Sequence, residues 1–402
     1  MSFITLASGE AVNNFWNPGM NSTSKRNGRL EIRQVSGKKD LKTFIRVPWR
    51  IYKDDPNWVP PLLFERKEAF SDHHPFFNHA KWRAWTAFRD GEAVGRISAQ
   101  IDNLHLQQYD TKAGFFGLIE APDDDEVFKA LFETAENWLR DEGMQQVIGP
   151  FNLNINQDLG ILVEGFDTPP YIMTGHAPAY YGPAIERCGY RPAQDLLAYG
   201  LDSGTLAIPR VMRALIERSG DRIKVRKLNV KAKAAELESM RDIFNDAWEN
   251  NWNFVPFTAE EFTQIGKELL MAAPADFIQI AEVDGEDSAF IVLLPNINEA
   301  IADLDGHLLP FGWARLLWRL KVEFPKSGRV ALMGVRQKFQ NTRFGPALAY
   351  VTINEVMEAG KARGLERVEM SWILDHNHGV RNIIESVGGV ITKRYRMYEK
   401  SL

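Results

Sequence analysis

Residues 329–350 read RVALMGVRQKFQNTRFGPALAY, and this stretch decides how the rest of the chain is interpreted. Its first seven residues predict a buried strand, and the run from Pro346 to Gly364 has the apolar spacing of a helix. A polar, basic turn joins the two. A helix N-terminus carries unpaired N–H groups and about half a positive charge, so such a turn can bind a phosphate. Gly345 allows a close backbone approach, and Pro346 suits a first helical turn.

The elements around this stretch occur in an order that the chain uses twice. Two Asp-Gly turns, Asp90-Gly91 and Asp284-Gly285, each separate a pair of strand-like runs, which is a strong hairpin signal. Further strands and helices follow each hairpin in the same sequence. Two copies of one mixed α/β layout are the simplest account. We place the boundary near 203–210, with domains at 29–204 and 205–402, and interpret residues 1–28 as a flexible N-terminal arm.

Composition limits the classes of function. The chain has 402 residues, 45% hydrophobic and 25% charged, as in ordinary globular domains. It has 48 basic and 53 acidic residues, and this net charge of −5 gives no reason to expect nucleic-acid binding. The single cysteine, Cys188, excludes an intramolecular disulfide and a multi-cysteine zinc site. No run of about 20 apolar residues and no signal peptide is present, which predicts a cytoplasmic protein.

The two copies differ in charge at the turn that precedes the main helix. Residues 321–343 contain six basic residues and one acidic residue, Glu323. The equivalent turn of the first copy, GLIEAPDDDE at 117–126, contains five acidic residues and no basic one. Acidic side chains cap a helix well but repel a phosphate. The sequence therefore predicts an anion site in the second copy alone.

These residues resemble the GCN5-related N-acetyltransferases, over 222–402 and more weakly over 29–202. The family's cofactor motif, [RQ]xxGx[GA], matches Gln340, Arg343 and Gly345, although Arg343 stands where the family has its middle glycine. The resemblance implies a tandem protein, each domain a mostly antiparallel twisted sheet flanked by helices, with acetyl-CoA or a longer acyl-CoA as cosubstrate and no metal. The cofactor-binding residues implied are Met333, Gly334, Val335, Arg336, Gln340, Asn341, Thr342, Arg343, Phe344, Gly345, Pro346, Ala347 and Asn377.

The family chemistry implied is direct attack of an amine on the acyl thioester. It needs a general base, backbone N–H groups that polarise the carbonyl, here between Leu332 and Val335, and an acid for the leaving thiolate. We expect catalytic roles for His376, Asn377 and Glu369, with Glu282 as a further carboxylate candidate. The tyrosine that often serves as the acid is replaced by Ile384. His376 and His378 are too few ligands to predict a metal site.

The long connection from Asn152 to Tyr181 is either a plug between the two copies or part of the acceptor site. Our candidate substrate-binding residues in it are Asn154, Asp158, Tyr180 and Tyr181.

A second segment, 311–321, places Arg315 and Arg319 one turn apart in an apolar helix. It either packs on its own domain, or covers a long acyl chain or contacts a membrane-borne substrate.

The sequence thus predicts an acyl-CoA-dependent N-acyltransferase, of the class EC 2.3.1, acting on a small-molecule or lipid amine. Acyl carrier protein is an alternative acyl donor, and contact with a membrane as a peripheral protein is one expected mode of reaching a lipid. The alternative is a non-catalytic CoA-binding module that has lost turnover, which Arg343 and Ile384 motivate.

Overall fold

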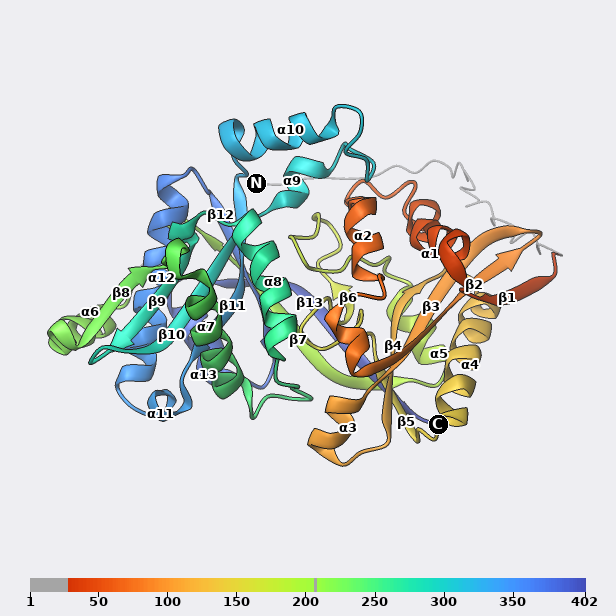
Figure 1. Ribbon diagram of the computed structural model, residues 1–402, viewed down its shortest axis with the longest axis horizontal. Helices are drawn as coiled ribbons and strands as arrows, with labels where there is room; N and C mark the ends of the chain where they lie inside the picture. Colours follow the sequence, from red (N-terminus) through yellow and green to blue (C-terminus); the bar gives the residue numbers. More distant parts are fainter. Residues whose placement is uncertain (1–27, 206–207) are drawn as a thin grey trace, which may run out of the picture.

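The computed structural model describes residues 28–205, here called the first half, and 208–402, the second half (Figure 1). Residues 1–27 of the expected N-terminal arm lie outside the described residues, so the arm stays a prediction. No helix in these two ranges is both long and apolar enough to cross a membrane.

The first half contains seven strands and five α-helices in its described residues. In chain order they are β1 (Leu30–Gln34), α1 (Gly37–Ile51), α2 (Leu63–Ala69), the 3₁₀ turn η1 (Pro75–Asn78), β2 (Ala80–Arg89), β3 (Glu92–Asp102), α3 (Asn103–Tyr109), β4 (Ala113–Glu120), α4 (Asp125–Asp141), β5 (Gln146–Gly149), β6 (Ile161–Glu164), α5 (Tyr181–Arg187) and β7 (Arg191–Asp202).

The second half follows the same plan with additions. Its elements are α6 (Arg210–Ser219), η2 (Gly220–Arg222), β8 (Ile223–Lys227), η3 (Val230–Ala232), α7 (Lys233–Trp248), α8 (Ala259–Ala272), η4 (Ala275–Phe277), β9 (Ile278–Val283), β10 (Glu286–Pro295), α9 (Ile297–Ile301), α10 (Gly312–Trp318), the π-helical turn η5 (Arg319–Glu323), β11 (Ser327–Val335), α11 (Gln337–Gln340), α12 (Phe344–Ala362), β12 (Arg367–Leu374), α13 (His378–Ser386) and β13 (Val390–Ser401).

The described strands form one sheet in the order β1-β2-β3-β4-β5-β13-β7-β12-β11-β10-β9-β8, and β6 pairs with β13. The pairs β4–β5 and β11–β12 are parallel, and the others are antiparallel. This confirms the mixed fold with mostly antiparallel strands.

The two halves exchange their last strands. Strand β13 of the second half pairs with β5 of the first, where Tyr398 is opposite Gly149. Strand β7 of the first half pairs with β12 of the second, where Leu201 is opposite Val368. A cut at 204/205 would therefore leave each half without one of its own strands. The domain boundary stays a prediction about the repeated layout, and the sheet itself is continuous across it.

Local chemistry explains the hairpins and the layers. Both expected Asp-Gly turns form, with positive φ at Asp90 (53°), Gly91 (81°), Asp284 (55°) and Gly285 (86°), the backbone of a type I′ turn. Helices α7 and α12 cover opposite faces of the second half's sheet. Ala289 packs in a cluster with Leu348 of α12, and the next residue, Phe290, contacts Phe244 of α7. Successive strand residues point to opposite faces, which separates the two layers.

Candidate active site

Strands β11 and β12 pair over four residues and then diverge. The last paired residues are Val330 and Met370. Ala331 lies at a register shift against β10, and such bulges re-aim neighbouring backbone groups and are frequent beside active sites. Further along β11, the Met333 carbonyl accepts a hydrogen bond from Trp248 Nε1 at 2.9 Å. Beyond Val330, the β12 side of β11 therefore has no strand partner among the described residues, and we call this stretch of strand edge the gap.

The backbone at this edge can bind an extended ligand. A strand residue points its N–H and its C=O to the same side. Because the Met333 carbonyl points away from β10, its N–H does so too. The Val335 carbonyl accepts from Gln340 Nε2 at 2.8 Å, so Val335 has the same orientation. Gly334 between them faces α7, where an added Cβ would lie 3.4 Å from Ala247.

In the first half, the chain itself fills the equivalent gap. Pairing of β4 with β5 ends at Phe115 and Ile148. Beyond it, the Leu118 N–H donates to the Asn152 side chain at 2.8 Å, and the Ala121 N–H donates to the Tyr181 hydroxyl at 3.0 Å. These contacts occupy the backbone groups that a ligand would need.

The turn before α4 also differs from its counterpart. Asp124 caps the helix by accepting from the N–H groups of Glu126 and Val127. A carboxylate at this point takes the place that a phosphate would occupy, because both use the same donors. The first half therefore offers neither an open strand edge beside β4 nor a start of α4 at which a phosphate could bind.

The turn before α12 is built by tight backbone packing. Gly345 is buried, and a Cβ there would lie 2.7 Å from the carbonyl oxygens of both Phe339 and Gln340. Thr342 accepts from the Phe344 N–H at 3.1 Å through its hydroxyl, and from the Gly345 N–H at 3.2 Å through its carbonyl. The sequence led us to expect these two N–H groups to be free for a phosphate, whereas the turn uses them itself. A substitution at Gly345 would therefore disturb the fold as well as any ligand.

Most of the basic residues counted from the sequence are neutralised. Arg329 is buried in the sheet, and three others form ion pairs: Lys326 with Glu366 at 3.3 Å, Arg336 with Asp242 at 2.7 Å and Lys338 with Glu286 at 2.6 Å. Arg343 is exposed, lies over the Phe344 ring at 5.3 Å and forms no ion pair with any described residue. The sequence count overstated the local charge, and Arg343 remains as the cation that the turn offers.

Glu369 lies beside the point where the two strands separate. Its side chain is 1% exposed, and Oε1 accepts from the Ser371 hydroxyl at 2.7 Å. Arg329 Nε donates to the same hydroxyl at 2.8 Å and lies 3.9 Å from Oε1. Burial raises the pKa of Glu369, and the Arg329 charge opposes this only partly. A buried carboxylate with a raised pKa is suited to proton transfer near neutral pH.

Unpartnered polar atoms surround this carboxylate. The Glu369 Oε2, the Tyr395 hydroxyl and the Trp372 Nε1 are buried and have no hydrogen-bond partner among the described residues. The Arg329 guanidinium lies 4.6 Å from the centre of the Trp372 ring, and the rings of Trp372 and Tyr395 are 6.1 Å apart. Buried polar atoms are rarely left unbonded, so three of them around one carboxylate mark this region as a candidate site for a polar ligand.

One predicted acceptor residue belongs to this region. Burial raises the pKa of Asp158, and the charges of Arg66 and Arg329 oppose the rise. Two residues further along, Gly160 packs against Tyr395, where an added Cβ would lie 3.0 Å from the Tyr395 Cβ. Asp158 and Glu369 thus share the surroundings of Arg329, although they are distant in sequence. We call Asp158, Arg329, Glu369, Trp372 and Tyr395 the polar cluster.

The other predicted acceptor residues lie elsewhere. Tyr181 is buried in the first half, where its hydroxyl donates to Glu120 at 2.8 Å, and the Tyr180 hydroxyl donates to the Ala121 carbonyl at 2.9 Å. Asn154 donates to Glu261 of α8 at 2.9 Å. These three side chains hold the structure together, so we do not carry them into the proposed site.

The predicted residues after β12 are less favourably placed than Glu369. Asn377 caps α13, accepting from the Val380 N–H at 3.2 Å. The His376 side chain is 61% exposed and lies 3.4 Å from Asp375. Glu282 is paired with Arg226 at 2.6 Å on β9, near the β8 edge of the sheet. Ile384 is buried in the hydrophobic core of the second half, so this position supplies no acid for a thiolate.

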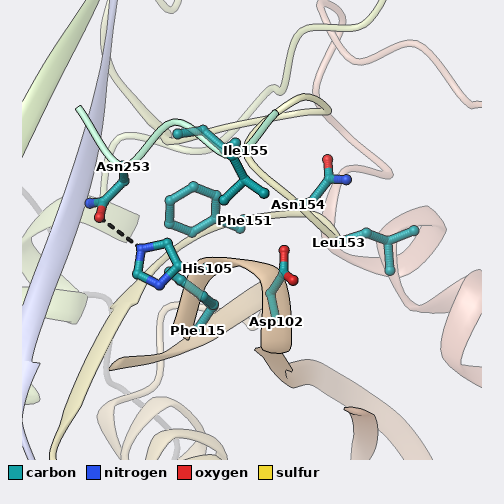
Figure 2. Close-up of a pocket in the computed structure, with 9 residues that line it drawn as sticks. Asp102, His105, Phe115, Phe151, Leu153, Asn154, Ile155 and Asn253 are labelled. Carbon is teal, nitrogen blue, oxygen red and sulfur yellow. Dashed lines mark hydrogen bonds between the residues drawn. The ribbon is translucent and has the colours of Figure 1, made fainter. Parts of the chain in front are cut away.

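A separate small pocket lies between the halves (Figure 2). It measures about 10 Å³ and is lined by Asp102, His105, Phe115, Phe151, Leu153, Asn154, Ile155, Asn253 and Val255. His105 is hydrogen-bonded to Asn253 across it at 3.0 Å. A space of this size holds one water molecule at most, so it is no substrate pocket.

A charged triad borders the same interface. His79 Nδ1 lies 2.9 Å from Asp102, and His79 Nε2 lies 3.2 Å from Glu261. Burial lowers the pKa of His79, but the two carboxylates outweigh it and raise the pKa to about 9. His79 is therefore charged at neutral pH and links the first half to α8 of the second.

Sequence reasoning missed Ser371, Trp372, Tyr395 and Trp248 as site residues, and it treated Arg329 only as one base among six. One signal was available. An arginine and a glutamate, Arg329 and Glu369, stand inside otherwise apolar strands, and buried charges of this kind are retained only when paired or functional.

Comparisons with known proteins bear on the whole chain. No family model matches it. It is 47% identical to Protein YghO of Escherichia coli K12 over 371 residues, which is 92% of this chain and 95% of that protein. It is 45% identical to the bacterial ceramide synthase of Caulobacter vibrioides over 381 residues, 94% of this chain and 98% of that protein.

Solved structures show the same fold at low identity. A tandem GNAT protein from the clavulanic acid biosynthesis pathway matches with a TM-score of 0.54 and 10% identity, covering 93% of this chain and 98% of that one. A GCN5-related N-acetyltransferase from Sphaerobacter thermophilus matches with a TM-score of 0.51 and 12% identity, covering 92% and 95%.

Proposed function

We propose that this chain, which belongs to the same family as the bacterial ceramide synthase of Caulobacter vibrioides and has the fold of tandem GNAT proteins, transfers a fatty acyl group from acyl-CoA to the amine of a long-chain amino alcohol. A ceramide is the amide of such an amino alcohol with a fatty acid. The 45% identity to a bacterial ceramide synthase, over 94% of this chain, supports the substrate class.

The observation that carries the proposal is the polar cluster beside the open edge of β11. The Met333 N–H lies on that edge and can donate to the thioester carbonyl, which stabilises the negative charge that develops there. Arg343, which is exposed on the turn beyond it, would bind the phosphates of CoA through charge-assisted hydrogen bonds.

Glu369 is the proposed base. In its ionised form it takes a proton from the ammonium group of the acceptor. The neutral amine then attacks the carbonyl carbon, the new N–C bond forms, the C–S bond breaks and the CoA thiolate leaves. The second amine proton passes to solvent. Asp158 would hold the incoming ammonium group by charge, and the Tyr395 hydroxyl and Trp372 N–H would bond to acceptor hydroxyl groups.

The lack of an acid at Ile384 favours a second candidate, a CoA-binding module without turnover. Free-thiol release separates the two. Pure protein would be mixed with acetyl-CoA or palmitoyl-CoA and with a panel of amines that includes sphinganine. The proposed enzyme releases thiol fastest with palmitoyl-CoA and sphinganine. Tight CoA binding without thiol release for any pair would support the module, and no CoA binding would refute both. A cytoplasmic location fits a CoA substrate and stays a prediction.

A further inference from the structure

The segment between β10 and β11, residues 297–323, has a packed inner side. Ile301 and Leu304 cluster with Leu62 of the first half, and Leu316 of α10 adds to that contact. The Leu63 N–H donates to the Gly306 carbonyl at 3.0 Å. Figure 1 shows α10 (cyan) at the upper edge of the molecule, outside α9. The inner side therefore packs on its own half, as one expectation had it, and on the first half as well.

The outer side of the segment is apolar and exposed. We call it the α10 face, and it consists of Leu309 (80% exposed), Phe311 (75%), Trp313 (51%), Leu317 (50%), Trp318 (57%) and Val322 (59%). Trp313 and Leu317 are one helical turn apart, so they lie on the same side of α10. Soluble monomers seldom leave so many large apolar side chains uncovered in one segment.

Charge on this segment identifies the kind of partner. Residues 309–322 contain three basic residues, Arg315, Arg319 and Lys321, and no acidic residue. Glu323 follows directly, and Arg315 and Arg319 share one carboxylate, that of Asp303. Residues 309–323 together with Asp303 therefore keep one net positive charge. A symmetric contact between two copies would bring these cations together, because the same patch meets itself across a two-fold axis. An anionic surface meets them with opposite charge.

We propose that the α10 face docks this protein, as a peripheral protein, on a bilayer that carries anionic lipids. Tryptophan, phenylalanine and leucine beside arginine and lysine are the residues that bury at the headgroup boundary. Each basic residue near an anionic leaflet adds attraction that salt screens.

Docking through the α10 face would also bring a lipid acceptor to the proposed active site, and this part of the inference rests on the proposed function. Asn298 donates to the Pro170 carbonyl at 2.9 Å, and the Ile172 N–H donates to Asn296 at 3.0 Å. The same loop accepts from Arg329 of the polar cluster at the Ile172 carbonyl, at 3.1 Å. The segment that carries the α10 face is therefore bonded, at the start of α9, to the loop that binds Arg329, so an amphipathic acceptor held in the bilayer is presented near the site.

Flotation of the full chain with vesicles tests the proposal. Phosphatidylcholine vesicles with phosphatidylglycerol should carry the protein, vesicles without phosphatidylglycerol should carry less, and added salt should weaken both. The variant Trp313→Ser/Leu317→Ser/Trp318→Ser should lose at least about tenfold in partition, since each side chain loses buried apolar area. The control Val230→Ser/Met271→Ser also removes exposed apolar side chains, 57% and 82% exposed in the native chain, and should partition like wild type.

Several outcomes would overturn it. One is that the wild-type protein stays in the soluble fraction with both vesicle types. Another is that the folded triple variant floats as well as the wild type. A third is that the wild type is a dimer in light scattering, the triple variant is a monomer, and neither binds vesicles. Unchanged circular dichroism and melting temperature show that the variants fold. The assay contains neither acyl-CoA nor acceptor, so its failure is distinct from failure of the proposed reaction.

Discussion

Arg329 and Glu369 are register partners on neighbouring parallel strands, with Nε and Oε1 3.9 Å apart and the Ser371 hydroxyl bonded to both. This arrangement fixes one carboxylate oxygen and leaves Oε2 without a partner among the described residues. A fixed carboxylate with one available oxygen beside an open strand edge is the arrangement that a general base requires.

Replacing the base should lower turnover. Glu369→Gln is expected to reduce kcat by about 10²–10⁴ with little change in acyl-CoA affinity, because the amide cannot accept the ammonium proton. The wild-type rate should rise with pH through the raised pKa of Glu369, since the ionised form is active, and the variant should lose this limb. Glu282→Gln, at a carboxylate paired with Arg226, is the control. Equal rates for Glu369→Gln and wild type would exclude Glu369 as the base.

The turn residue Arg343 should govern acyl-CoA affinity. Arg343→Gln is expected to raise the Kd for acyl-CoA by about tenfold, the effect of losing a charge-assisted hydrogen bond, and to make the Kd less sensitive to salt. Lys338→Gln is the matched control, because Lys338 is already paired with Glu286 at 2.6 Å. Calorimetric titration gives both values, and a larger effect for Lys338 than for Arg343 would contradict the assignment.

Tyr395 should matter for the acceptor and not for folding. Its hydroxyl is buried and unbonded, so Tyr395→Phe should leave the free energy of unfolding unchanged or slightly higher while it raises the acceptor KM. Tyr199→Phe is the comparison, because the Tyr199 hydroxyl donates to Glu385 at 2.7 Å; this change should lower the unfolding free energy by about 1 kcal/mol. Urea titrations and acceptor kinetics measure both. A destabilised Tyr395→Phe variant with normal kinetics would assign Tyr395 to structure.

The ion pairs of His79 with Asp102 and Glu261 should make the free energy of unfolding depend on pH. The pKa of His79 is raised to about 9 from 6.5, so its contribution is complete below about pH 6.5 and is lost as the pH rises through 9. The difference in unfolding free energy between wild type and His79→Gln should therefore shrink over that range. Urea unfolding of both proteins at several pH values measures it, and a difference that grows with pH would contradict the assigned charge.

Local signals explain what the sequence predicted well. The Asp-Gly turns need positive φ at two residues, which few other pairs tolerate, and the acidic cap of α4 follows from Asp124 standing before its helix. The strand, turn and helix at 329–350 are likewise set by neighbouring residues.

Long-range contacts explain what it could not predict. The exchange of β7 and β13 depends on pairings such as Tyr398 with Gly149, which no local pattern encodes. The short strand β6 was hidden in the 152–181 connection because its pairing partner is also distant, as with Leu162 and Tyr395. The count of basic residues overstated the charge of the turn before α12 for the same reason. Arg336, for example, is paired with Asp242, which lies in α7, far away in the sequence.

The most direct test of the central claim is the amide product itself. Wild-type protein incubated with palmitoyl-CoA and sphinganine should form N-palmitoyl sphinganine, detected by mass spectrometry, with one free CoA released for each amide. Saturable binding of palmitoyl-CoA with no amide formed from sphinganine or any other long-chain amino alcohol would contradict it.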